Sequence, residues 1–355
     1  MARAASKPKP TKKRLADQID AHANEPVVVS ESPPPVIPSG CSLLNIALAE
    51  NVDAAYPVGE MVNIVGDKSA GKTLLALTAC AEVAHNEKFD HYDIRYRDKE
   101  GRTDQFPLKA MFGERFIERV EFKPPPITVE EFSAEVRAFK KPTVYVIDSL
   151  DSLTSEGEIA HAKKADAARK AGKPAPGSYG QEKAKAMSAM FRLCCNHLKE
   201  TGSVLIVLSQ VRENINAGIF DPKFRRNGGK ALDFYAYHIF WLAVCKTLKR
   251  TLKYKDKDVT RVVGQRVRAN ITKNGVTGKR RTVEFDTLYQ YGVDDIGAMF
   301  DFCIDHGAIE LTNRKKQLAA FEAGDKQIEW LKRATLETWN DIEARFAPMR
   351  KARFE

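Results

Sequence analysis

The chain has 355 residues, of which 43% are hydrophobic and 29% charged, a mixture that excludes a disordered protein or a membrane protein. Its length allows about two domains with a sizeable buried core. Lysine and arginine exceed aspartate and glutamate by 57 to 47, so the formal net charge is +10. This balance favours polyanionic partners, and nucleic acid first among them.

The six cysteines and seven histidines show none of the spacings that hold a metal, such as C-x-x-C or H-E-x-x-H. The cysteines lie mostly in apolar or helical stretches, as free thiols do in a reducing compartment. No apolar run is long enough to cross a membrane, and the first residues lack the apolar segment of a secretory signal. We therefore expect a cytoplasmic protein with no membrane partner.

Residues 1–35 are predicted to form a basic arm and an oligomerisation segment. The first 16 residues contain six Lys or Arg and no acid, which is typical of a basic arm. Leu15, Ile19 and His22 follow at helical spacing, and the apolar run at 26–29 predicts a short edge strand. The proline cluster at 33–35 then indicates a stiff linker.

The region 36–287 shows short β-branched runs separated by longer helical stretches, which predicts an α/β fold with a mostly parallel twisted sheet. The predicted strands are 61–65, 143–147, 203–208 and 239–245. Two further runs, 265–272 and 279–285, flank turn sequences and predict an antiparallel hairpin at the sheet edge. The composition changes near residue 288, so we predict a small C-terminal α/β domain at 288–355.

Two stretches, 156–181 and 211–231, interrupt the alternation of strands and helices. Each contains five Lys or Arg, and the second also contains three glycines. Long loops inside a compact domain are usually functional or disordered. Both stretches are therefore candidate functional loops.

Residues 66–73 fit the phosphate-binding pattern G-x-x-x-x-G-K-[ST]. The pattern follows an apolar strand and opens an alanine- and leucine-rich helix, which is the placement that phosphate binding requires. We expect Lys72 to reach the β- and γ-phosphates and Thr73 to bind Mg²⁺, so the predicted cofactors are ATP and Mg²⁺. The predicted nucleotide-binding residues of this loop are Gly66, Asp67, Lys68, Ser69, Ala70, Gly71, Lys72 and Thr73.

Three polar residues follow other predicted strands. Asp148 ends the run 143–147 and is predicted to hold Mg²⁺ through water. Glu100 follows a possible strand at 92–96 and is the candidate for aligning the attacking water, with a solvated loop glutamate as the alternative. Gln210 follows the run 203–208, where it contacts the γ-phosphate or is an ordinary strand-end amide. The predicted catalytic residues are Lys72, Glu100 and Gln210.

The motifs, in this order, resemble those of the RecA recombinase family of bacteria and bacteriophages. The strings G-D-K-S-A-G-K-T, V-I-D-S-L-D-S-L-T, L-S-Q-V-R and G-G-K-A-L-D-F-Y-A follow one another along the chain. The last is similar to the family's G-G-x-A-L-x-F-Y-A, which ring helicases do not usually share. The resemblance extends from Val36 to about residue 335.

The resemblance implies a RecA-type P-loop ATPase core and a DNA-dependent ATPase. Such a protein forms a helical filament on single-stranded DNA and catalyses homologous pairing and strand exchange. Its partners are single- and double-stranded DNA and further copies of the chain. Two alternatives stay open: a ring-forming helicase or motor of the same superfamily, and an ATP-gated DNA-binding mediator with little hydrolysis.

The resemblance also assigns further site residues. Asp104 and Lys273 fall on nucleotide-binding positions, and the stretches 156–181 and 211–231 match the family's two DNA-binding loops. The DNA-binding residues predicted from these loops are Lys163, Lys164, Arg169, Arg212, Phe220, Lys223, Arg225, Arg226, Gly228, Gly229 and Lys230.

The sequence departs from the family at the subunit interface. The family has Lys-Asn-Lys, with both lysines facing ATP bound by the neighbour, whereas this chain has Lys273, Asn274 and Gly275. The role of the second lysine is therefore vacant or filled by one of the cations that follow, which are Lys279, Arg280 and Arg281.

Overall fold

The computed structural model describes residues 36–99, 101, 103–172, 180–213, 224–226 and 229–346. The predicted basic arm lies outside the described residues, as do the site residues Glu100, Phe220, Lys223 and Gly228. Among the described helices, none is long and apolar enough to span a membrane.

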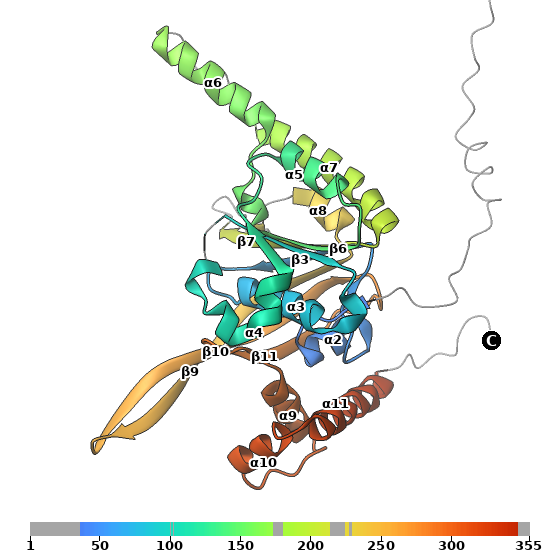
Figure 1. Cartoon of the computed structure of the whole chain (residues 1–355), viewed down its shortest axis with the longest axis vertical. Helices are drawn as coiled ribbons and strands as arrows, with labels where there is room; N and C mark the ends of the chain where they lie inside the picture. The colour runs from blue at the N-terminus through green and yellow to red at the C-terminus, as the bar shows by residue number, and fades with distance from the viewer. Residues whose placement is uncertain are drawn as a thin grey trace, which may run out of the picture. The chain divides into compact units, whose positions relative to one another are not determined.

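One large sheet forms the centre of the described chain (Figure 1). Its parallel strands are, in spatial order, β5 (Val120–Lys123), β4 (Asp93–Asp98), β6 (Thr143–Asp148), β7 (Val204–Glu213), β3 (Met61–Gly66) and β9 (His238–Tyr254). Beyond β9 the sheet continues with the antiparallel strands β10 (Lys257–Asn274), β11 (Thr282–Leu288) and β12 (Gly292–Asp294). The predicted α/β fold, with a mostly parallel sheet and an antiparallel edge, is confirmed.

Helices cover both faces of the sheet, which explains why its strands are continuous apolar runs. In β6, Val144 and Val146 face one core cluster, and Tyr145 and Ile147 face the other. The first cluster includes residues of α2 (Ser42–Ala49), α3 (Lys72–His85) and α4 (Leu108–Arg119). The second includes residues of α5 (Val129–Arg137), α7 (Gly180–Thr201) and α8 (Gly229–Tyr235).

The stretch 156–181, which the sequence analysis treats as a loop, contains the helix α6 (Glu156–Lys170) and the first residues of α7. Ser155 and Glu158 form a capping box at the start of α6, with each side chain accepting from the other's backbone N–H at 3.2 and 3.1 Å. The helix buries none of its residues and projects from the sheet (Figure 1). The loop prediction was therefore wrong for 156–170, because the capping box and the alanines favour a helix without a core to pack against.

The stretch 211–231 also contains regular structure. Strand β7 continues to Glu213, and β8 (Phe224–Arg226) pairs antiparallel with its end. Helix α8 then begins at Gly229. The predicted second loop is thus shorter than the stretch, and its central residues 214–223 lie outside the described part of the chain.

Strands β9 and β10 form a hairpin that the sequence analysis does not predict, and both extend beyond the predicted strands 239–245 and 265–272. β9 pairs with β3 only as far as Leu242, and β10 pairs with β11 only from Gly264 onward. Residues 249–254 and 257–262 therefore pair only with each other and project as a two-stranded ribbon (Figure 1). The predicted strands stop where this ribbon leaves the sheet, because both of its faces are solvated and the apolar signal disappears.

The C-terminal region is helical apart from β12, which is the last strand of the main sheet. The helices are α9 (Asp295–Asp305), α10 (Arg314–Phe321) and α11 (Asp325–Arg345), and they enclose a third core cluster around Phe300 and Leu331. The expected strand content of a C-terminal α/β domain is thus not found within 295–346. The domain boundary near residue 288 stays a prediction.

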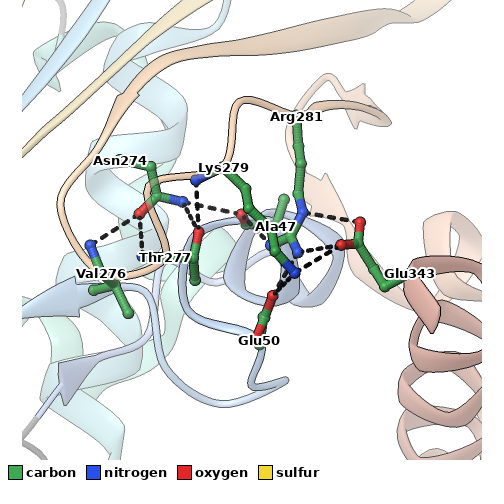
Figure 2. A network of polar contacts seen from close by, with 8 residues as sticks. All are labelled: Ala47, Glu50, Asn274, Val276, Thr277, Lys279, Arg281 and Glu343. Carbon is green, nitrogen blue, oxygen red and sulfur yellow. Dashed lines mark hydrogen bonds and ion pairs between the residues drawn. The ribbon is translucent and has the colours of Figure 1, made fainter. Parts of the chain in front are cut away.

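A cluster of charges joins the β10–β11 turn to helices α2 and α11 (Figure 2). Arg281 donates to Glu343 at 3.0 and 2.6 Å and to Glu50 at 2.5 Å. Lys279 donates to the same two carboxylates at 2.8 and 3.0 Å, and Arg281 also reaches the carbonyl oxygen of Ala47 at 3.1 Å. The Arg281 side chain is only 7% exposed, so its bonds are shielded from water.

Replacing Arg281 by alanine is expected to lower the free energy of unfolding by about 2 kcal/mol, because hydrogen bonds between charged groups are lost. Lys279 holds the pKa of Glu50 below its usual 4.5, and Arg281 does so for Glu343. A lowered folded-state pKa gives stability that is lost as pH falls, so the effect should shrink below about pH 4. Urea unfolding at several pH values measures it. Arg280→Ala is the control, and an equal loss there would contradict the assignment.

Candidate nucleotide-binding site

The carboxyl ends of four neighbouring strands meet at one edge of the sheet. Gly66 at the end of β3 is paired in register with Gln210 of β7, and Asp98 at the end of β4 is paired with Asp148 of β6. Strands β6 and β7 are themselves neighbours. Ligands bind at this edge of open parallel sheets. The structure therefore brings together the predicted phosphate loop, Asp148 and Gln210.

Two glycines of the loop occupy positions that other residues would fit poorly. A Cβ atom at Gly66 would lie 2.8 Å from the carbonyl oxygen of Leu242 on β9. Gly71, immediately before α3, has a φ of 88°, which lies in the left-handed region that favours glycine. The loop consequently turns tightly into α3, and the N–H groups and positive dipole end of that helix adjoin it.

Lys72 and Thr73, the first two residues of α3, are both buried. The Lys72 ammonium donates to the carbonyl oxygens of Gly66 and Asp67, at 2.8 Å each, and so lies within the curve of the loop. The Thr73 hydroxyl donates to Oδ2 of Asp148 at 2.6 Å. A hydroxyl that donates its proton in this way can still offer lone pairs to a cation.

Tyr96 is a member of this site that the sequence analysis missed. It lies on β4, is fully buried, and donates its hydroxyl proton to the same Oδ2 of Asp148 at 3.1 Å. Burial, with Asp148 as the next cause, raises the pKa of Tyr96 well above its usual value, so the phenol stays a neutral donor. A tyrosine within an apolar strand gives no signal in the sequence that its hydroxyl points to a carboxylate.

A cavity of about 360 Å³ adjoins the loop. Besides loop residues, it is lined by Phe106, Gln265, Thr287 and Tyr289, and Gln265 donates to the carbonyl oxygen of Ser69 at 2.7 Å. None of these four was predicted, because they come from the turn after β4 and from the β10–β11 pair, and only the folded sheet places them beside the loop. The predicted Asp104 lies exposed, two residues before Phe106.

The charged segment after β4 is anchored by Asp98. Its Oδ2 accepts hydrogen bonds from the backbone N–H of Thr103 at 2.7 Å and from the Thr103 hydroxyl at 2.8 Å. These bonds hold both ends of the short segment that contains Glu100. The predicted position of the Glu100 side chain is untested, because that residue lies outside the described ones.

Beside Gly275, where the sequence departs from the family, lies the aromatic ring of Tyr237. Lys273 donates to the carbonyl oxygens of Asp233 and Phe234, at 2.8 Å each, near the end of α8. A Cβ atom at Gly275 would lie 2.5 Å from the ring of Tyr237, so a lysine there would require that ring to move.

Of the three cations proposed as replacements, two already have partners in the chain. Lys279 and Arg281 form ion pairs with Glu50 and Glu343 (Figure 2). Arg280 is exposed and makes no ion pair with any residue that the structure describes.

The predicted DNA-binding residues within the described chain lie on elements that follow β6 or end β7. Lys163, Lys164 and Arg169 are exposed on α6. Arg212 lies on β7, Arg225 and Arg226 on β8, and Gly229 and Lys230 in the first turn of α8. The described basic residues of α6, β7 and β8 are thus attached to the same edge of the sheet as the phosphate loop.

Comparison with known proteins identifies the family. Protein RecA of Corynebacterium urealyticum is 30% identical to this chain over 285 residues, which cover 79% of this chain and 68% of that protein. Protein RecA 1 of Myxococcus xanthus is 28% identical over 309 residues, covering 84% and 80%. The chain belongs to the RecA family. A family profile described as the RecA N-terminal domain matches residues 140–294, which include Asp148, Gln210 and Lys273. The resemblance predicted from the motifs is confirmed, and the chain is a nucleotide-using RecA-family recombinase.

Proposed function

We propose that this protein is a DNA-dependent ATPase that assembles as a helical filament on single-stranded DNA and catalyses homologous pairing and strand exchange. The observation that supports this best is the register of β3 and β7, which sets Gly66 of the phosphate loop beside Gln210. From Gln210 the chain enters the second basic stretch. The end of β7 therefore adjoins both the proposed nucleotide site and the proposed DNA-binding segment.

The residues present fit Mg²⁺ and ATP. Thr73 and Asp148 supply the hard oxygen atoms that Mg²⁺ prefers, and the glycines let the loop turn tightly into α3, whose N-terminal N–H groups adjoin it. Lys72 and these N–H groups would bind and orient the phosphates, and Thr73 and Asp148 would hold the metal, Asp148 through water. When bound, Mg²⁺ neutralises charge on the phosphates. Glu100 orients the attacking water and accepts its proton.

Gln210 is proposed to couple the presence of the γ-phosphate to the conformation of the DNA-binding segments. Its backbone N–H donates to Oδ2 of Asp151 at 2.8 Å, and Asp151 lies in the turn between β6 and α6. One hydrogen bond thus joins Gln210, which directly precedes the second basic stretch, to the turn that leads into the first. A contact between Gln210 and the γ-phosphate biases the conformation of both basic stretches, and DNA affinity then depends on which nucleotide is bound.

The basic residues of α6, β7 and β8 are proposed to bind DNA phosphates, with affinity that falls as salt rises because counterions are released. Phe220 stacks on bases in a manner that tolerates sequence. Further copies of the chain add head to tail, a contact that does not close on itself and so builds a helix. In this assembly Lys273 contacts the nucleotide bound by the neighbouring subunit, and Asp104 contacts nucleotide.

The alternative of an ATP-gated mediator with little hydrolysis gains support from one observation. The Tyr237 ring lies where a second interface lysine would begin, so one of the two cations facing the neighbour's nucleotide is absent. Loss of one such cation would slow hydrolysis more than nucleotide binding, because negative charge develops on the leaving diphosphate in the transition state. A ring-forming helicase or motor is the other alternative.

The test is phosphate release with and without a single-stranded oligonucleotide, together with electron microscopy of the assemblies and a homologous-pairing assay. We expect DNA to stimulate ATP hydrolysis by at least about tenfold, since nucleotide and DNA are coupled sites. We also expect open helices and paired products. Closed rings would favour the helicase. ATP-dependent DNA binding without hydrolysis would favour the mediator, and no DNA binding would contradict all three.

A further inference from the structure

The carboxylate of Asp148 is held by two hydroxyl groups on one oxygen atom. Thr73 donates to Oδ2 at 2.6 Å from α3, and Tyr96 donates to it at 3.1 Å from β4. The pairing of β4 with β6 sets these strands side by side, and Tyr96 faces the side of the sheet that α3 covers. The Tyr96 ring is itself packed against Phe122, with 5.7 Å between the ring centres.

We propose that Tyr96 is a positioning residue for the Mg²⁺–nucleotide site, and that its hydroxyl holds the Asp148 carboxylate in the orientation that the Thr73 hydroxyl and the metal require. The inference rests on the proposed function and adds to it a residue that no sequence motif assigns.

The argument depends on how freely the carboxylate can turn. The terminal torsion of an aspartate is broad, so each hydrogen bond that the carboxylate accepts defines its plane more closely. The Tyr96 ring is fully buried, so its hydroxyl is a donor at a fixed point. A second bond to the same oxygen therefore restricts rotation of the carboxylate before the metal binds, and this preorganisation strengthens metal binding.

Loss of the Tyr96 hydroxyl is expected to weaken the binding of Mg²⁺ and not the binding of the nucleotide alone. The loop N–H groups and Lys72 hold the phosphates without help from Tyr96, so nucleotide affinity in the absence of Mg²⁺ should not depend on it. Mg²⁺ must orient Asp148 when the Tyr96 hydroxyl is missing. The effect of removing that hydroxyl should therefore appear in the Mg²⁺ requirement.

Tyr145 provides a matched control on the next strand. It is also fully buried, and its hydroxyl donates to Oε2 of Glu135 at 2.8 Å. Its ring faces the opposite side of the sheet, in the cluster that α5 and α7 cover. Tyr145→Phe thus removes the same kind of bond, from a phenol to a carboxylate, away from the phosphate loop.

The experiment measures the affinity for fluorescently labelled ADP across a Mg²⁺ titration and in EDTA, for the wild type, Tyr96→Phe and Tyr145→Phe. Direct binding of Mn²⁺ in the presence of ADP is followed by electron paramagnetic resonance. For Tyr96→Phe we expect the half-saturating Mg²⁺ concentration to rise about tenfold, as for loss of one bond to a charged group. Affinity in EDTA should stay within about twofold of the wild type. Tyr145→Phe should leave both values unchanged.

A double-mutant cycle tests whether Tyr96 influences Mg²⁺ binding through Asp148. If Tyr96 acts through Asp148, Tyr96→Phe should add little to the Mg²⁺ requirement of Asp148→Asn, whereas independent effects would multiply.

The proposal is overturned by an unchanged Mg²⁺ requirement in Tyr96→Phe, by an equal rise in Tyr145→Phe, or by independent effects in the cycle. A Tyr96→Phe chain that does not fold, beside a folded Tyr145→Phe, would assign the hydroxyl to the fold and also overturn it. A wild type that binds no nucleotide would instead contradict the proposed function.

Discussion

Replacing Lys72 by alanine is expected to reduce ATP turnover on the order of a thousandfold, as for loss of a preorganised donor to the transition state. The ammonium lies 2.8 Å from the carbonyl oxygens of Gly66 and Asp67, inside the loop that is proposed to hold the phosphates. ATP-dependent DNA binding should be lost with turnover. Phosphate release and fluorescence anisotropy of a labelled oligonucleotide measure the two effects.

Lys68→Ala is the matched control for this variant. Lys68 belongs to the same loop and lines the same cavity, but its residue is exposed whereas Lys72 is buried. We expect turnover in Lys68→Ala to fall by less than about tenfold, because an exposed charge is screened by water. Both variants should unfold cooperatively in urea, since neither change removes packing from the core. Turnover in Lys72→Ala within tenfold of the wild type would contradict the phosphate-loop assignment.

Replacing Glu100 by glutamine is expected to slow hydrolysis by at least about a hundredfold, the lower end for loss of a positioned general base. The amide keeps the shape of the side chain but accepts no proton. ATP binding and assembly on DNA should therefore be retained. Single-turnover hydrolysis, compared with nucleotide affinity and with electron microscopy of the assemblies, separates the chemical step from binding.

Asp98→Asn is the control for Glu100→Gln. Asp98 ends β4 and Glu100 follows it by two residues, but the Asp98 carboxylate accepts two hydrogen bonds from Thr103. Its replacement should loosen that segment and lower stability, because a hydrogen bond to a charged acceptor is weakened. Should Asp98→Asn stop hydrolysis while Glu100→Gln does not, the residue correspondence inferred from the family resemblance is wrong by two positions.

The sequence predicted the parallel core because its signals are local. Strands buried on both faces must be apolar at every position, so runs such as 61–65 and 143–147 stand out against the helical stretches around them. The phosphate loop is equally local, since one strand, one glycine-rich turn and one helix N-terminus are consecutive in the chain. These predictions agree with β3, β6 and α3 to within a residue.

The sequence predictions failed where an element leaves the core. Helix α6 and the outer ends of β9 and β10 have solvent on every side, so no pattern of apolar residues marks them. The helix is indicated instead by its capping box at Ser155 and Glu158, a signal that the sequence contains. The ribbon turns at Lys255 and Asp256, which both have positive φ, and it contains no Asn-Gly or Asp-Gly pair to mark that turn in the sequence.

The sequence by itself determined the fold class, the phosphate loop and the identity of the residues that follow each strand, because these depend on neighbours in the chain. Only the tertiary structure decided which side chains meet at the site. Tyr96 reaches Asp148, Gln265 reaches Ser69, and the Tyr237 ring takes the space beside Gly275. Each contact depends on the order and register of strands that are far apart in sequence, and a shift of one residue would turn each side chain to the other face.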